Sequence, residues 1–161
     1  MRIVPDFDMN EVDRYIEERV RRFHAAVVMR LDAIGEQAVN AARNLPSPNA
    51  DDFPDPGNIP PHQPNYMDWS GNLRNSIGYV VQDGGKRAKE KFPGRGEGAD
   101  KAKALAAKIA ASYPTGFVLV VVAGEEYATY VADKGYDVLD TAQIVAEQLI
   151  ARLKRKMQGL T

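Results

Sequence analysis

The chain has 161 residues, of which 44% are hydrophobic and 27% charged, and its formal net charge is −1. This length is typical of one domain with its own core, so we expect a single domain over residues 1–161. The balanced charge provides no general attraction to nucleic acid or to a membrane surface. The absence of cysteine excludes disulfides, thiolate metal sites and cysteine nucleophiles. We expect no secretion signal, and the longest apolar run (117–123) is too short to span a bilayer.

Residues 8–45 are predicted to form one long helix. Asp8 and Glu11 have the spacing of a capping box, although Asp stands where Ser or Thr is usual. Apolar residues then recur at steps of three and four until Pro46 prevents the helix from continuing. This stripe comprises Ile16, Val20, Phe23, Val27, Leu31, Ile34, Ala38, Ala41 and Leu45.

The length of this helix has a structural consequence. At 1.5 Å per residue it spans roughly 55 Å, whereas a compact domain of this size is about 40 Å across. Either Gly35 kinks the helix, or it folds into a self-contained coiled-coil hairpin, or a neighbouring copy covers the excess stripe. We expect the last, a homo-oligomer, with Phe23, Val27 and Leu31 as candidate interface residues on the helix.

Residues 46–68 are predicted to form a proline-rich arm. Positions 46–64 hold seven of the ten prolines and three aspartates, without lysine or arginine. Such a segment favours extended geometry over helix or sheet. It is either a surface connector or an arm that orders against a neighbouring subunit, with Pro54 and Pro60 as candidate interface residues. Trp69 either returns the chain to the core or, if exposed, marks an interface.

The rest of the chain, residues 69–161, is predicted to be an α+β core. A strand over 78–82 ends at a turn at 83–85. Residues 86–108 carry eight cations against three carboxylates. We expect the first half of this basic segment to be a flexible loop, with Lys86, Arg87 and Lys89 as candidate interface residues, and the second half to be an alanine-rich helix capped by Asp100.

Three further elements complete the predicted core. The continuous apolar run over 117–123 is typical of a central strand covered on both faces. Residues 127–133 are compatible with a short helix or an edge strand. A C-terminal helix over 140–158 is expected to begin with Asp140 as its cap and Leu139 packed against Ile144. The predicted fold is therefore α+β: a long N-terminal helix and a C-terminal helix packed on a small, mainly antiparallel sheet, with a long proline-rich loop.

The sequence contains no convincing arrangement for catalysis. His24 and His62 lack metal-ligand spacing, and we place His24 at the edge of a packed face. The adjacent carboxylates at 17–18, 51–52 and 125–126 are interpreted as solvated surface groups. The glycine-rich stretch at 94–98 lies in a polar loop, outside the strand–helix context of a phosphate cradle. We expect no enzyme activity, no catalytic residue, no metal and no cofactor.

Two short motifs are the most distinctive features of the chain. The first runs through Ser70, Gly71, Asn72, Leu73, Arg74, Asn75, Ser76 and Ile77. We expect the Ser70 side chain to accept a bond from a following amide, Gly71 to allow a tight turn, Leu73 and Ile77 to point inward, and Arg74 to be free to pair outward. The second motif holds Tyr127, Ala128, Thr129, Tyr130, Val131, Ala132, Asp133, Lys134 and Gly135.

These motifs and their order resemble the tail-component family of tailed bacteriophages. The first is similar to that family's "TGNLRNSI"-like turn into a strand, with Ser70 where Thr is usual. The second is similar to its "YAxYVExG"-like segment, except that Ala132 stands at the position of the usual Glu and Asp133 follows. The resemblance extends to the long N-terminal helix, the proline-bearing loop and the C-terminal helix.

This resemblance implies a structural role rather than a chemical one. Such proteins join head to tail as neck or tail-completion components, assembled as rings in the bacterial host cytoplasm and retained in the virion. The implied partners are further copies in a homo-oligomeric ring, other phage neck and tail proteins, and non-specifically contacted transiting DNA, with no membrane. The alternative is a small nucleic-acid-binding accessory protein that uses the basic segment 86–108, although no aromatic residues interleave with its cations. In a phage neck, the basic segment would instead contact either transiting DNA or the acidic proline-rich arm of an adjacent subunit.

Overall fold

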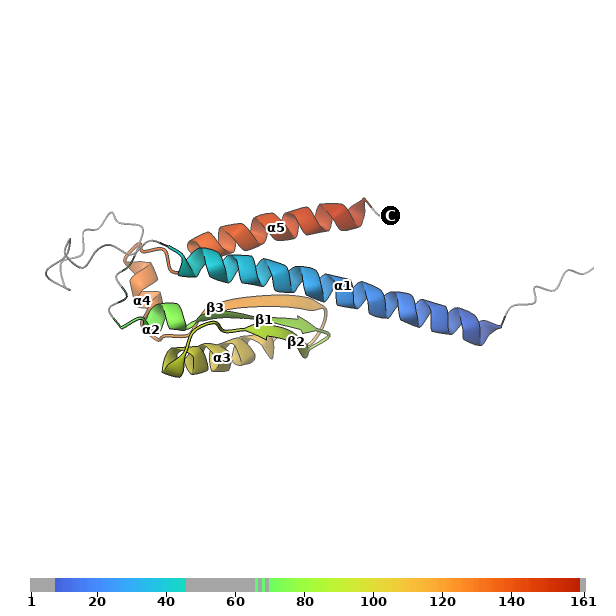
Figure 1. The fold of residues 1–161 in the computed structure, drawn as a ribbon, viewed down its shortest axis with the longest axis horizontal. Coiled ribbons are helices and arrows are strands. Elements are labelled where there is room, and N and C mark those ends of the chain that lie inside the picture. The colour runs from blue at the N-terminus through green and yellow to red at the C-terminus, as the bar shows by residue number, and fades with distance from the viewer. Residues whose placement is uncertain (1–7, 46–65, 67, 69, 160–161) are drawn as a thin grey trace, which may run out of the picture.

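A computed structural model of the chain describes residues 8–45, 66, 68 and 70–159. It has the predicted α+β arrangement, with a long N-terminal helix, a C-terminal helix and a small antiparallel sheet (Figure 1). The elements in chain order are α1 (Met9–Arg43), α2 (Asn72–Asn75), β1 (Ile77–Asp83), β2 (Lys86–Lys91), α3 (Gly96–Ala110), β3 (Phe117–Ala123), α4 (Ala128–Asp133) and α5 (Asp140–Gln158). Helices α1 and α5 cover one face of the sheet, and α3 covers the other.

The sheet has the strand order β2-β1-β3, and both pairings are antiparallel. Gly84 and Gly85, at φ 57° and 77°, form the two-residue turn that joins β1 to β2. Both positive φ angles suit the turn that matches the twist of a hairpin, and glycine adopts them at little cost. The expectation of a flexible loop after this turn is wrong, because residues 86–91 pair with β1 as a strand.

Strand β3 also differs from expectation, because it lies at the edge of the three described strands rather than at their centre. Its apolar run is typical of a central strand, yet β1 is its only partner among the described strands. Five of its seven residues are half-buried rather than buried. The central position belongs to β1, six of whose seven residues are buried.

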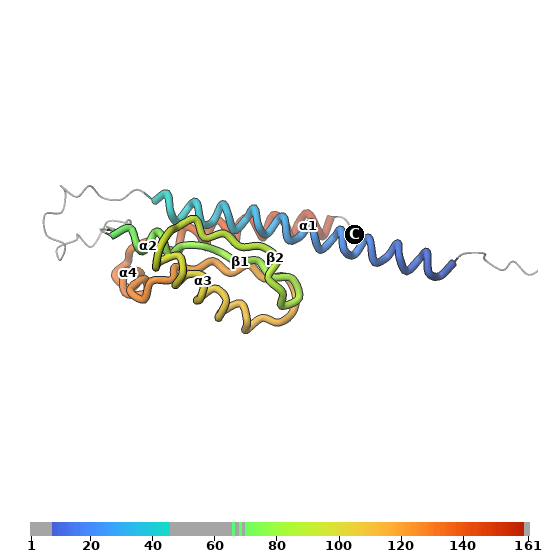
Figure 2. The backbone as a smooth tube through the Cα atoms, turned by 60° about the horizontal axis from the view of Figure 1, so that its bottom comes forward, coloured from blue at the N-terminus to red at the C-terminus, as the bar shows by residue number. Residues whose placement is uncertain are grey.

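Helix α1 has 35 residues, a length of about 52 Å. The Asp8 carboxylate accepts a bond of 2.9 Å from the Asn10 amide, which confirms the predicted cap. The helix runs without interruption through Gly35, where the backbone approaches the ring of Tyr79. Its first half extends beyond the sheet and beyond α5 in both views (Figures 1 and 2). The structure therefore contains the protruding helix, and neither the kink nor a full-length hairpin.

The core has two main layers. Val27, Leu31, Ile34 and Ala38 of α1 pack with one face of β1 and with half-buried residues of α5. On the other face, the alanines of α3 pack closely against the sheet, as their small side chains predict. Helix α3 begins at Gly96 rather than at the predicted Asp100.

The C-terminal helix is present, but its predicted start signals are not used. Asp140 is the first helical residue and makes no cap bond, and Ile144 is exposed, so no staple forms with Leu139. Instead the carboxylate of Asp137 accepts from the Thr141 amide at 3.1 Å and from the hydroxyl of the same residue. The segment whose type was left open is the short helix α4.

Candidate assembly surfaces and the motif network

The first half of α1 carries an exposed apolar stripe. Residues 9, 12, 16, 20 and 23 continue the stripe that builds the core, at steps of three, four, four and three, so that the pattern repeats after eleven residues. This eleven-residue repeat corresponds to 3.67 residues per turn, so a nearly straight helix keeps every member on one face. The stripe is 49–59% exposed at Met9, Ile16, Val20 and Phe23 and 36% exposed at Val12. The same helix face is thus buried in its second half and bare in its first.

This boundary corrects two of the predicted interface residues. Val27 and Leu31 are buried in the chain's own core, because β1 and α5 already lie against that part of α1. Phe23 remains about half exposed, at the edge of the body, with its ring edge toward Phe117. Sequence reasoning expected part of the stripe to be uncovered but did not name Val12, Ile16 and Val20 as interface candidates, because the pattern alone could not separate them from core positions.

A second apolar surface lies between β3 and α5. Helix α5 packs chiefly on α1 and leaves a groove of about 260 Å³ along the outer strand. Leu119 and Val121 line it from the sheet, and Leu139, Ala146 and Ile150 line it from the helix segment. Apart from Gln143 and Glu147 at its rim, the lining is apolar. Strand β3 has no charge and no proline, which are features that commonly protect an edge from pairing.

The predicted basic surface is carried by β2, whose six residues are all exposed. The candidates Lys86, Arg87 and Lys89 therefore lie at the surface. Several cations of the basic segment are paired within the chain, which reduces the charge available to a partner. The pairs are Arg87 with Glu90, Lys91 with Glu36, Lys101 with Glu97 and Glu125, and Lys103 with Asp100.

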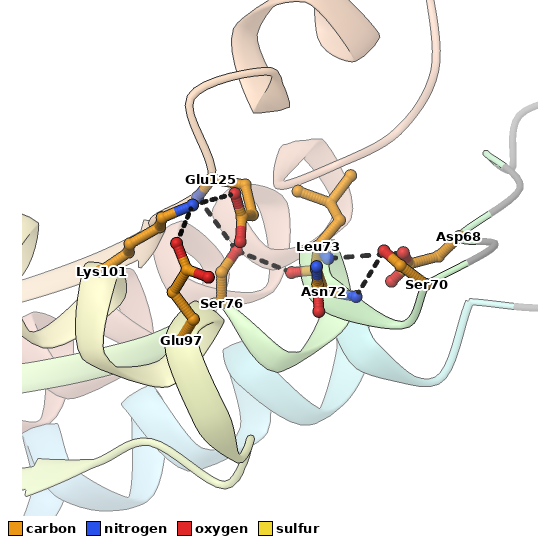
Figure 3. Close-up of polar contacts among 8 residues, drawn as sticks. All are labelled: Asp68, Ser70, Asn72, Leu73, Ser76, Glu97, Lys101 and Glu125. Carbon is orange, nitrogen blue, oxygen red and sulfur yellow. Dashed lines mark hydrogen bonds and ion pairs between the residues drawn. The ribbon is translucent and has the colours of Figure 1, made fainter.

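The first motif holds the short helix α2 between the end of α1 and the start of β1 (Figure 3). The Ser70 hydroxyl accepts from the Asn72 amide at 3.2 Å, as predicted, and Gly71 adopts φ 72°. The Asp68 carboxylate accepts from the Arg74 amide at 2.8 Å. Leu73 and Ile77 are 1% and 0% exposed, which confirms that they point inward.

Arg74 does not extend freely outward as expected. Its guanidinium donates to the carbonyl of Leu45 at 2.6 Å, and Arg43 donates in return to the carbonyl of Arg74. The first bond satisfies the Leu45 carbonyl just beyond the C-terminus of α1, where backbone carbonyls have no partner inside the helix, and the second ties Arg43 of α1 to the backbone of α2. The motif arginine therefore attaches the end of the long helix to the body.

The serine at the end of the motif connects three elements. The Ser76 hydroxyl is fully buried, donates to the Leu73 carbonyl at 2.8 Å and accepts from the Glu125 amide at 3.2 Å (Figure 3). The Glu125 side chain, expected at the surface, is buried and pairs with Lys101 at 3.0 Å. The carboxylates of Glu125 and Glu97 raise the pKa of Lys101 above its ordinary value. This network fixes the start of β1 and the end of β3 to α3.

The two motifs meet in a third apolar cluster. Leu73 of the first motif packs there with Ala128 of the second, together with Tyr66, Tyr136 and Val138. Tyr127 and Tyr130 are exposed, and Gly135 ends α4 at φ 87°. Two sequence signals separated by about fifty residues thus form one structural unit at one end of the sheet.

His24 lies at the edge of the packed face, as predicted. Its Nδ1 is 2.7 Å from a carboxylate oxygen of Asp83, and its ring contacts Phe117. Among the described residues no three histidine, aspartate or glutamate side chains group as a metal site. In the same part of the chain, no helix is both long and apolar enough to cross a bilayer. The candidates Pro54, Pro60 and Trp69 lie outside the described residues.

Comparison with known proteins leaves the geometry as the main guide to function. The chain matches no protein-family model, no curated protein and no solved structure. The features of the chain that bear on its function are the two motifs and the two apolar surfaces, the stripe on α1 and the groove between β3 and α5.

Proposed function

We propose that the chain is a structural component of a tailed-phage or prophage virion, a neck or tail-completion protein that works as an oligomeric ring between head and tail. The observation that carries the proposal is the bare half of the α1 stripe. A helix face that builds the core in one half and meets solvent in the other is complete only when another protein covers it. Exposed apolar surface of this kind marks a protein interaction site.

The motif network supports the same role. Its bonds hold the end of α1, the end of β3 and α3 in fixed positions. A subunit of a ring must present its interfaces at a constant angle, and a rigid connection between the long helix and the body serves that requirement. The resemblance of both motifs to phage tail components supports this kind of assembly.

The alternative, a nucleic-acid-binding accessory protein, has less support. Its basic segment is exposed on β2, but Arg87, Lys91, Lys101 and Lys103 already pair with carboxylates of the same chain. Binding to phosphates would have to compete with those pairs, and it would weaken steeply with salt.

The test of the role is removal of the chain from the phage or prophage that encodes it. A stop codon early in the reading frame is expected to give full heads and separate tails in electron micrographs, with joining restored by the wild-type chain supplied in trans. Normal joined particles would contradict the proposal. Light scattering at two salt concentrations, with and without DNA, tests the alternative, which requires a small species that changes size only when DNA is added.

A further inference from the structure

We propose that the bare stripe of α1 docks into the groove between β3 and α5 of the next copy, so that the subunits join head to tail. The inference rests on the proposed function and adds the identity of the receiving surface. It unites the two main apolar surfaces that the described part of the chain leaves uncovered.

The two surfaces match in length. The stripe advances fourteen residues from Met9 to Phe23, about 21 Å of helix, and its part from Val12 to Phe23 covers eleven residues and about 16.5 Å. Along the groove, Leu139 and Ile150 are also eleven residues apart. On the sheet side the groove is lined by Leu119 and Val121, which lie two residues apart on the same face of β3.

The two surfaces also match in character. Stripe side chains that are about half exposed would enter a lining made mostly of leucine, valine, isoleucine and alanine. A specific interface between proteins buries roughly 1,000 Å² or more in total. A subunit in a closed ring makes two contacts of the proposed kind, one with its stripe and one with its groove, so the area that holds each subunit is twice that of a single contact.

The charges beside the stripe favour docking into the groove over pairing with the α1 helix of a second copy. Arg19 borders the stripe on one side, three residues after Ile16, and Asp13 and Glu17 border it on the other. In an antiparallel pair of α1 helices each flank would face the same flank of the other copy, which brings like charges together. The groove offers Glu147 as its one charged lining residue, opposite in sign to Arg19.

The contact is heterologous, since the stripe and the groove are different surfaces of the same chain. A heterologous contact closes into a ring when the rotation between neighbours fits, whereas a self-complementary contact ends at a dimer. The proposed geometry therefore generates the kind of assembly that a head–tail joint requires.

Because the chain has no cysteine, the contact can be tested with two single-cysteine copies of different tag mass. One carries Val20→Cys in the stripe, and the other carries Ala146→Cys in the groove. After mixing and treatment with a short bismaleimide, we expect the mixed product to form on the order of a thousandfold faster than undocked thiols react. Docking holds the thiols at millimolar effective concentration, compared with micromolar bulk concentration. The matched control is Glu18→Cys, which lies on the opposite side of the same helix.

Two results would overturn the groove assignment. One is a Val20→Cys copy that joins mainly to itself, and the other is a mixed product that forms no faster than with the Glu18→Cys control. Self-joining in copies that still support head–tail joining would remove the groove from the account and leave the proposed function standing. Efficient cross-linking together with normal particles in the deletion strain would support the groove contact and contradict the proposed function.

A second experiment does not depend on cross-linking. Ile16→Asp breaks the stripe and Ala146→Arg blocks the groove, with folding of each verified by circular dichroism. Neither copy should assemble alone, and an equal mixture should stop at a one-to-one dimer, because only one intact stripe and one intact groove remain. Further growth of the mixture, or assembly of the Ala146→Arg copy alone, would contradict the proposal.

Discussion

The motif serine Ser76 should contribute strongly to the free energy of unfolding, and the magnitude of this contribution follows from the bonds that its hydroxyl makes. Ser76→Ala removes the acceptor for the buried Glu125 amide, which stands 3.2 Å from the hydroxyl oxygen. The Leu73 carbonyl keeps a partner, because the amide of residue 76 also donates to it at 3.1 Å. The loss is therefore one unsatisfied buried donor, which costs about 1–3 kcal/mol.

In a chain of this length, a loss of about 2 kcal/mol lowers Tm by about 4–8 °C. The assay is urea and thermal unfolding followed by circular dichroism. Ser70→Ala is the matched control, since it removes a motif hydroxyl that accepts a similar bond at the surface. Its effect should be below about 1 kcal/mol. Equal effects of the two substitutions would refute the reasoning that burial decides the cost.

Three further predictions are read from urea unfolding. Gly35→Ala should destabilise by about 1–3 kcal/mol, despite the better helix propensity of alanine, because the added carbon would lie 2.5 Å from the ring of Tyr79. Asp137→Ala should cost about 1 kcal/mol through the lost cap of α5, whereas Asp140→Ala should stay within about 0.5 kcal/mol. Burial, and then the bond to the Asp32 carboxylate, raise the pKa of Tyr79 above its ordinary 10.0, so the unfolded chain loses this proton first. Stability should thus fall as pH rises above 10, and Tyr79→Phe should make that fall shallower.

Each of these has a result that would count against it. An alanine at position 35 that raises stability would mean that the ring moves aside. Equal costs at 137 and 140 would mean that the cap is shared. Parallel stability curves for wild type and Tyr79→Phe between pH 9 and 11 would mean that the phenol is not held neutral by its surroundings.

Local signals in the sequence predicted most of the elements, because hydrophobic periodicity and the residues that end helices and strands determine them. The stripe and Pro46 defined α1 closely, and paired glycines marked the hairpin turn. The run over 117–123 was correctly identified as a strand. Its place at the edge could not be read, since an apolar run looks the same whether a third strand or an open groove lies beside it.

The wrong predictions share a physical cause, which is that tertiary contacts overrode the local preferences of the sequence. Residues 86–91 have no apolar alternation, and they form β2 because pairing with β1 overrides weak propensity. Asp140 fits the cap pattern, but Asp137 reaches the helix start through the preceding turn. Glu125 is of a residue type usual at the surface, and its burial is compensated by the ion pair with Lys101 of α3, which is distant in the sequence. No pattern along the chain shows such partners.

The central claim, that another copy completes the bare stripe of α1, is tested most directly by native mass spectrometry of the wild-type chain beside Ile16→Asp. The wild type should give ring-sized multiples of 17.7 kDa, and the variant should give 17.7 kDa alone. The variant should unfold at nearly the same temperature, because the replaced side chain is 52% exposed. A wild-type chain that stays at 17.7 kDa, or a variant that assembles as the wild type does, would contradict the account.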